Sequence, residues 1–131
     1  MLNKVQLIGR LGSPADVKTM QGGDNIATLS VATSESWKDK ITNEWKEKTE
    51  WHKVVCFGFN ADKAERFEKG TLLYVEGQLQ TRKWTDKAGV DKYTTEIVLQ
   101  KFNGTIRSLV KNEVASIVNT EVAQMDDEIP F

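Results

Sequence analysis

Short segments in which polar and apolar residues alternate, separated by polar turns, are the feature that most limits the fold of this chain. In the clearest one, Ala27, Leu29 and Val31 alternate with Thr28 and Ser30, the period of two that gives a β-strand one apolar face. β-Branched and aromatic residues mark the predicted strands, which cover residues 5–11, 17–20, 26–33, 49–59, 71–79 and 93–99. The pattern predicts an all-β protein.

One short helix interrupts the predicted strands. Asn60 is the expected N-cap of a helix over residues 61–69, and Gly70 supplies its C-terminal stop. The apolar stripe of this helix consists of Ala61, Ala64 and Phe67. About five strands with one helix after the third fit a five-stranded, partly open OB-fold barrel. An SH3-like barrel or a small sandwich is the alternative fold.

Two charged stretches between the predicted strands are interpreted as long β-hairpin arms. Residues 35–48 are rich in charged side chains and have Thr42 and Asn43 near their middle. Residues 82–92 are similarly charged and contain Gly89, a residue typical of turns. Strand segments flank each stretch, which favours a hairpin in both places.

Size and composition exclude several classes of protein. The chain has 131 residues, enough for one ordinary domain, and 39% of them are hydrophobic. No apolar run approaches the length of a transmembrane helix, and the opening MLNKVQLIGR lacks the apolar core of a signal peptide, so a cytoplasmic protein is expected. One cysteine, Cys56, and one histidine, His52, cannot form an intramolecular disulfide or a zinc site of the usual ligand count. No metal or cofactor is expected.

The charges divide the chain into a basic body and an acidic end. Residues 1–112 hold all 18 basic residues and 14 acidic ones, a net charge of +4, whereas residues 113–131 hold five acidic residues and no basic one. This favours a polyanion-binding domain over residues 1–110, although accidental clustering of charge at a solvated end is the alternative. Residues 111–124 are expected to form a short linker, and residues 125–131 the end of a disordered tail.

The last residues combine acidic with apolar side chains. The three acidic residues at 126–128 would be attracted to a basic surface. The three apolar residues at 129–131, together with the terminal carboxylate, can fill an apolar pocket with a cationic rim. The tip is therefore expected to bind partner proteins, with a merely solubilising tail as the alternative. The residues expected to make this contact are Asp126, Asp127, Glu128, Ile129, Pro130 and Phe131.

Each of the four tryptophans lies within three residues of a lysine or arginine, and these tryptophans are Trp37, Trp45, Trp51 and Trp84. A single tryptophan is more often a packing residue. Four of them beside cations indicate a binder of single-stranded nucleic acid, because every base has a face that can stack and every nucleotide carries a phosphate. The candidate phosphate contacts in these neighbourhoods include Lys38, Lys40 and Lys53.

Alternation along the strand at residues 49–59 sharpens this hypothesis. One face would present Trp51, Lys53, Val55 and Phe57, and the other His52, Val54 and Cys56. If the first face is an open groove, Trp51 and Phe57 can stack on bases and Lys53 can meet a phosphate, while Val54 and Cys56 pack inside. The opposite assignment would bury Trp51.

No catalytic constellation accompanies these aromatic residues. Cys56 and His52 lie four residues apart on one predicted strand, about 13 Å, too far for a nucleophile and its base. The glycines at 9, 12, 22 and 23 lack the following Lys-Ser or Lys-Thr of a nucleotide-binding loop. Catalysis is not expected. A nuclease and a pure protein-assembly factor are the alternatives, and the second would leave the paired tryptophans and lysines without a role.

Several sequence blocks resemble the bacterial single-stranded DNA-binding protein family. They are TSESWKDK, EKTEWHKVVCFG, YVEGQLQTRKWTDKAG, DKYTTEIV and the terminal DDEIPF. The resemblance spans nearly residues 1–110 and the tip. It implies an OB-fold, a homotetramer, binding of single-stranded DNA without sequence preference, and recruitment of replication, recombination and repair proteins through the tip in the bacterial nucleoid.

By the same resemblance, Trp37, Trp51, Phe57 and Trp84 are the expected stacking residues, Arg82 and Lys83 are phosphate contacts, and His52 lies near a subunit interface. Three features depart from the family pattern. The linker is short and lacks the usual glycine, proline and glutamine. Phe59 replaces a basic residue, and the start lacks a short arginine-bearing extension. Trp45 is an additional aromatic residue, either a further stacking platform or a residue that packs the arm.

Overall fold

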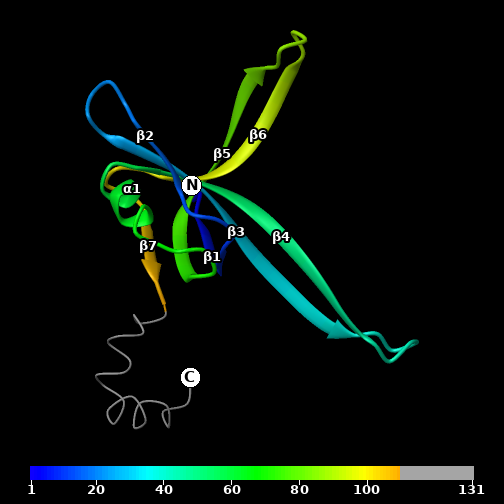
Figure 1. Ribbon diagram of the computed structural model, residues 1–131. Helices are drawn as coiled ribbons and strands as arrows, with labels where there is room; N and C mark the ends of the chain where they lie inside the picture. Colours follow the sequence, from blue (N-terminus) through cyan, green and yellow to red (C-terminus); the bar gives the residue numbers. More distant parts are fainter. Residues whose placement is uncertain (110–131) are drawn as a thin grey trace, which may run out of the picture.

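The computed structural model describes residues 1–109, and within them the chain forms seven strands and one short helix (Figure 1). The all-β prediction is confirmed. The predicted linker at 111–124 and the tip at 125–131 lie outside the described residues. The elements are β1 (Val5–Leu11), β2 (Asp16–Thr19), β3 (Asn25–Lys38), β4 (Trp45–Phe57), α1 (Phe59–Ala64), β5 (Leu72–Thr85), β6 (Asp91–Leu99) and β7 (Thr105–Ser108).

Five of the strands form a closed barrel in the order β1-β3-β4-β6-β5, and β1 pairs with β5 to complete the ring. Strand β1 pairs with both of its neighbours: Val5–Arg10 pair with β5, and Arg10 and Leu11 pair with β3. Strands β4 and β6 meet in a short parallel contact. The helix follows the third barrel strand, so the OB-fold prediction is confirmed, with a ring more complete than the expected partly open one.

The alternating residues fill the barrel interior as predicted. Ala27 and Val31 are fully buried and Leu29 nearly so, and they pack with inward side chains of β4, β5 and β6. Full burial of one such leucine or valine stabilises the fold by about 1.5–3 kcal/mol. The residues that complete this core include Val54, Cys56, Leu73, Val75, Ile97, Leu99 and Ile106.

The helix differs from the prediction at both ends. It spans Phe59–Ala64, its N-cap is Gly58 at φ +59°, and no side chain caps it. Asn60 is therefore not the N-cap, because its buried amide donates instead to the carbonyl oxygens of Gln100 and Gly104. Residues beyond Ala64 continue as turns. The predicted stripe is nevertheless correct: it packs against the core through Ala61, Ala64 and Phe67.

Both predicted hairpin arms are present and extend away from the barrel in different directions (Figure 1). The first, which we call the β3–β4 arm, consists of residues 33–51, and its two strands pair up to Lys38 and Trp45. The second joins β5 to β6 and pairs as far as Thr85 and Asp91. Strand β7 was not predicted. No helix within residues 1–109 is long and apolar enough to span a bilayer.

Candidate nucleic-acid interface

A shallow groove of about 410 Å³ runs over the outer face of the barrel, across β3, β4, β6 and β5. Its walls are mixed in character, with apolar, amide and charged side chains on neighbouring strands. The residues that line it are Ile26, Thr28, Lys53, Val55, Phe57, Gln80, Arg82, Glu96, Val98 and Gln100.

Strand β4 presents its two faces as the sequence predicted. Val54 and Cys56 are fully buried in the core, whereas Lys53, Val55 and Phe57 line the groove. Trp51 continues the outward row with 62% of its surface exposed. The alternation along β4 therefore places aromatic and cationic groups on one open surface.

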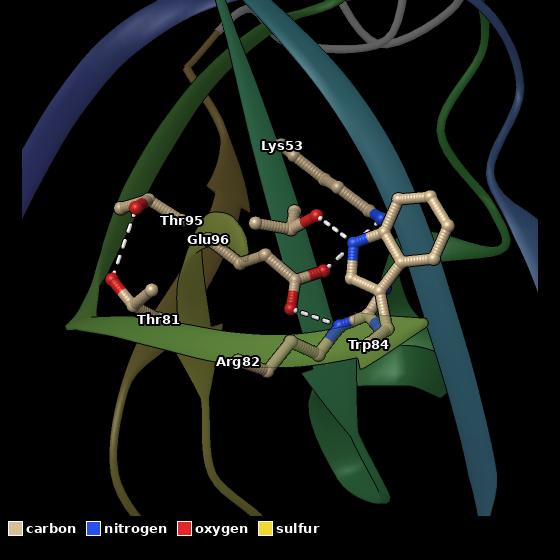
Figure 2. A network of polar contacts seen from close by, with 7 residues as sticks. Lys53, Thr81, Arg82, Trp84, Thr95 and Glu96 are labelled. Carbon is tan, nitrogen blue, oxygen red and sulfur yellow. Dashed lines mark hydrogen bonds and ion pairs between the residues drawn. The ribbon is translucent and has the colours of Figure 1, made fainter. Parts of the chain in front are cut away.

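Glu96 of β6 holds the two groove cations together (Figure 2). Its carboxylate accepts a hydrogen bond from Nε of Arg82 at 2.8 Å and pairs with Nζ of Lys53 at 3.2 Å. The Glu96 side chain is only 6% exposed, while the Arg82 and Lys53 side chains remain 49% and 38% exposed. The buried carboxylate thus orients both cations from the barrel side and offsets part of their charge. The other N–H donors of Arg82 and Lys53 are left for a ligand.

Trp84 lies on the same face of β5 as Arg82, near Lys53 and Glu96 in Figure 2. Its indole Nε1 donates a hydrogen bond of 2.7 Å to Oγ1 of Thr94. This bond fixes the edge of the ring, and 40% of the Trp84 surface remains exposed. A held ring with an open face is suited to stacking.

Lys83 does not share this surface. It alternates with Arg82 and Trp84, so it faces the other side of the second arm, opposite Tyr93. There it forms an ion pair of 3.3 Å with Asp91. The predicted cations Arg82 and Lys83 are therefore separated onto two faces.

The remaining predicted contacts lie on the β3–β4 arm. Trp37 is opposite Lys46, and Lys38 is opposite Trp45, in neighbouring pairs of the ladder. Trp37 and Trp45 consequently occupy different faces of the arm, with 44% and 73% of their surfaces exposed. Lys40 is exposed in the turn that joins the strands.

His52 and Cys56 have separate surroundings. The His52 ring contacts Oγ1 of Thr33 through Nε2 at 2.8 Å. Burial raises the pKa of the Cys56 thiol to about 12, so the thiolate is scarcely populated at neutral pH. Neither group is arranged as a nucleophile with its base.

Sequence reasoning missed three residues that shape the interface. Gly12 lies beneath the Trp51 ring, where an added Cβ would come within 2.4 Å of the indole. Thr94 holds Trp84, and Glu96 holds Lys53 and Arg82. Alternation would have placed Thr94 and Glu96 on one face of their strand, but only the register with β5 shows what that face adjoins.

An OB-fold barrel whose open face carries exposed aromatic rings and cations belongs to the class that binds single-stranded nucleic acid or oligosaccharide. The chain belongs to the Single-strand binding protein family, whose model matches residues 2–105.

Individual relatives match nearly the whole chain. A single-stranded DNA-binding protein of Rickettsia felis is 45% identical over 99% of this chain and 97% of its own length, and one of Rickettsia conorii is 44% identical with the same coverage. A Plasmodium falciparum SSB, solved in complex with ssDNA, has a TM-score of 0.73 and 44% identity over 84% of this chain and 96% of its own.

Proposed function

We propose that this protein binds single-stranded DNA without preference for sequence. The observation that supports the proposal best is the common outward face of Trp51, Lys53, Phe57, Arg82 and Trp84. The similarity to single-stranded DNA-binding proteins of Rickettsia and to the Plasmodium SSB solved with ssDNA favours the same ligand.

The proposed mechanism combines stacking with charge. Each base stacked on an aromatic side chain contributes about 1–3 kcal/mol, whichever base it is. The proposed stacking residues are Trp37, Trp45, Trp51, Phe57 and Trp84. The proposed phosphate contacts in the groove and on the β3–β4 arm are Lys38, Lys40, Lys53 and Arg82, and Lys83 is a further one on the other face of the second arm. The protein acts by binding alone, so single-stranded DNA incubated with it and magnesium or manganese should remain intact.

The wider role extends the same proposal to the whole chain. Residues 1–110 form the binding domain, which assembles as a homotetramer with His52 near a subunit interface. The tetramer coats and protects exposed strands during replication, recombination and repair in the cytoplasm. Residues 111–124 link it to the tip at 125–131, which recruits partner proteins.

Tryptophan fluorescence tests the ligand directly. The protein is titrated with oligo-dT and with a duplex of equal length at two salt concentrations. Strong quenching by oligo-dT alone, saturating at one long strand per four chains, is the expected result. The binding constant should fall with salt by a log-log slope of about 0.7 for each phosphate neutralised. Quenching by neither ligand would favour the assembly-factor alternative.

Two substitutions test whether stacking carries the binding. Trp51→Ala and Trp84→Ala should each weaken binding of oligo-dT, oligo-dA and mixed sequences by a similar factor, because each ring stacks on any base. Fluorescence anisotropy of labelled oligonucleotides measures the affinities. A loss confined to one sequence would contradict the stacking mechanism.

A further inference from the structure

The β3–β4 arm carries a tryptophan and a lysine on each of its two faces. Trp37 lies opposite Lys46 on one face, and Trp45 lies opposite Lys38 on the other. The two pairs are neighbouring rungs of the same ladder, so the alternation of side chains along each strand places them on opposite faces. Each face thus repeats the combination that suits one nucleotide, an aromatic ring beside a cation.

The face with Trp45 continues the groove. Trp45, Trp51 and Phe57 have the same parity on β4, six residues apart in each step, which is about 20 Å along a strand. Trp45 is the most exposed of the four tryptophans at 73%, which indicates a ring that is not packing the arm. Within the described residues, Lys38 forms no ion pair. A DNA strand that leaves the groove over Trp51 can therefore reach this pair without crossing the ribbon.

The face with Trp37 is separated from that path. Within residues 1–109, the outer part of the arm pairs only with itself, so the ribbon is two strands wide with two free edges. A segment stacked on Trp45 has the backbone of both strands between it and Trp37. The cation on this second face, Lys46, forms an ion pair of 3.0 Å with Asp39 and lies directly opposite Trp37 in the ladder.

We propose that the arm is a two-sided element that binds a separate single-stranded segment on each face. The segment that continues from the groove occupies Trp45 and Lys38, and a second segment occupies Trp37 and Lys46. This inference rests on the proposed function. It adds that one protomer can hold two DNA segments, one on each face of the arm, and these are either two strands or two passes of one strand.

Variants with a single tryptophan test the proposal, because each then reports one position. Three chains are compared in which only Trp37, only Trp45 or only Trp51 remains and the other tryptophans are phenylalanine. Each is titrated with a short oligo-dT, after circular dichroism shows that it is folded. The Trp45 and Trp51 signals should saturate together, and the Trp37 signal at a higher ratio of oligonucleotide to protein.

Two matched substitutions identify the cation on each face. Lys38→Met should reduce the log-log salt slope of the Trp45 signal by about 0.7 and leave the Trp37 signal unchanged. Lys46→Met should do the reverse. Trp37 and Trp45 signals that saturate in step, with each lysine affecting both alike, would overturn the proposal in favour of one segment.

The control with Trp51 separates two kinds of failure. Quenching of Trp51 without quenching of Trp37 or Trp45 would remove the two-sided arm and leave the proposed function standing. An absence of quenching in all three chains would remove the proposed function itself.

Discussion

Trp51 can hold its exposed position because Gly12 has no side chain. A Cβ at this position would lie 2.4 Å from Cζ3 of the indole, so the ring would have to move. Gly12→Ala should therefore weaken binding of oligo-dT by about 1 kcal/mol, a fraction of one stacked base. The free energy of unfolding should change little, because the contact is with the outer end of a side chain and alanine reduces the entropy of the unfolded chain.

Gly22 provides the matched control for this substitution, since a Cβ there would meet nothing within 4 Å. Gly22→Ala should leave the affinity unchanged and raise the free energy of unfolding by about 0.4–1 kcal/mol, because alanine fits there and reduces the entropy of the unfolded chain. Anisotropy titrations and urea unfolding measure the two quantities. Equal affinities for Gly12→Ala and the unmodified protein would show that the packing of Trp51 on this glycine is irrelevant to binding.

Glu96 offsets the charge of the two groove cations, and this effect can be measured through salt dependence. Glu96→Gln keeps the shape of the side chain but removes its charge from between Arg82 and Lys53. Affinity at low salt should rise, and the log-log salt slope should steepen by about 0.7, the equivalent of one more phosphate neutralised. Titrations of oligo-dT at several salt concentrations give the slope.

The second arm supplies a control carboxylate. Asp91 pairs with Lys83 on the face away from the groove, so Asp91→Asn should alter the slope less than Glu96→Gln. A lower affinity with an unchanged slope in Glu96→Gln would mean that the carboxylate acts only by positioning Arg82 and Lys53.

At the scale of the elements, the end of the β3–β4 arm is held by one carboxylate. Hydrogen bonds from the backbone of Ile41, the ammonium of Lys46 and the backbone of Thr42 hold the pKa of Asp39 below its ordinary value of 3.8. A lowered pKa stabilises the folded turn above pH 3.8, and this contribution is lost as the pH falls through the value of the folded state.

The turn should consequently loosen in acid before the barrel unfolds. Asp39→Asn should produce the same loosening at neutral pH, because the charged partner of Lys46 is gone. Hydrogen exchange of the Asn43 amide, which donates to the carbonyl oxygen of Asp39, reports the turn. Exchange that is as slow in Asp39→Asn as in the unmodified protein would contradict this assignment.

Local pattern predicted most elements because strand alternation records which face is buried. Val54 and Cys56 follow this rule, and their burial placed Trp51 and Phe57 outside. The helix start was wrong because Asn60, a common N-cap residue, is used by carbonyl groups some 40 residues away. A local sequence pattern around Asn60 gives no information about partners so distant in the chain.

The same limit applies to the candidate site. The tryptophans were recognisable from neighbouring cations, whereas the roles of Gly12, Thr94 and Glu96 depend on strands that are distant in the sequence. Alternation along β5 separates Arg82 from Lys83, whereas the register of β3 against β4 separates Trp37 from Trp45.

At the scale of the whole molecule, charge is distributed unevenly between the body at +4 and the acidic end. We expect the acidic residues of the tip to compete weakly with DNA for the cationic groove when little salt is present. Deletion of residues 125–131 should therefore raise the affinity for oligo-dT at low salt, and the difference should shrink as salt screens the charges. Identical binding isotherms for the two chains would remove this idea.

The double role of β1 has a consequence for how the protein is made. Val5 pairs with Gly77, so during synthesis β1 lacks its main partner until β5 has been made. Contacts between such distant parts of a chain slow folding, because a long loop must close before they form. Until then, the backbone N–H and C=O groups along one edge of β1 are unpaired, and they can pair with another copy of the chain. Crowded polysomes should thus be the setting in which this barrel is most prone to misassembly.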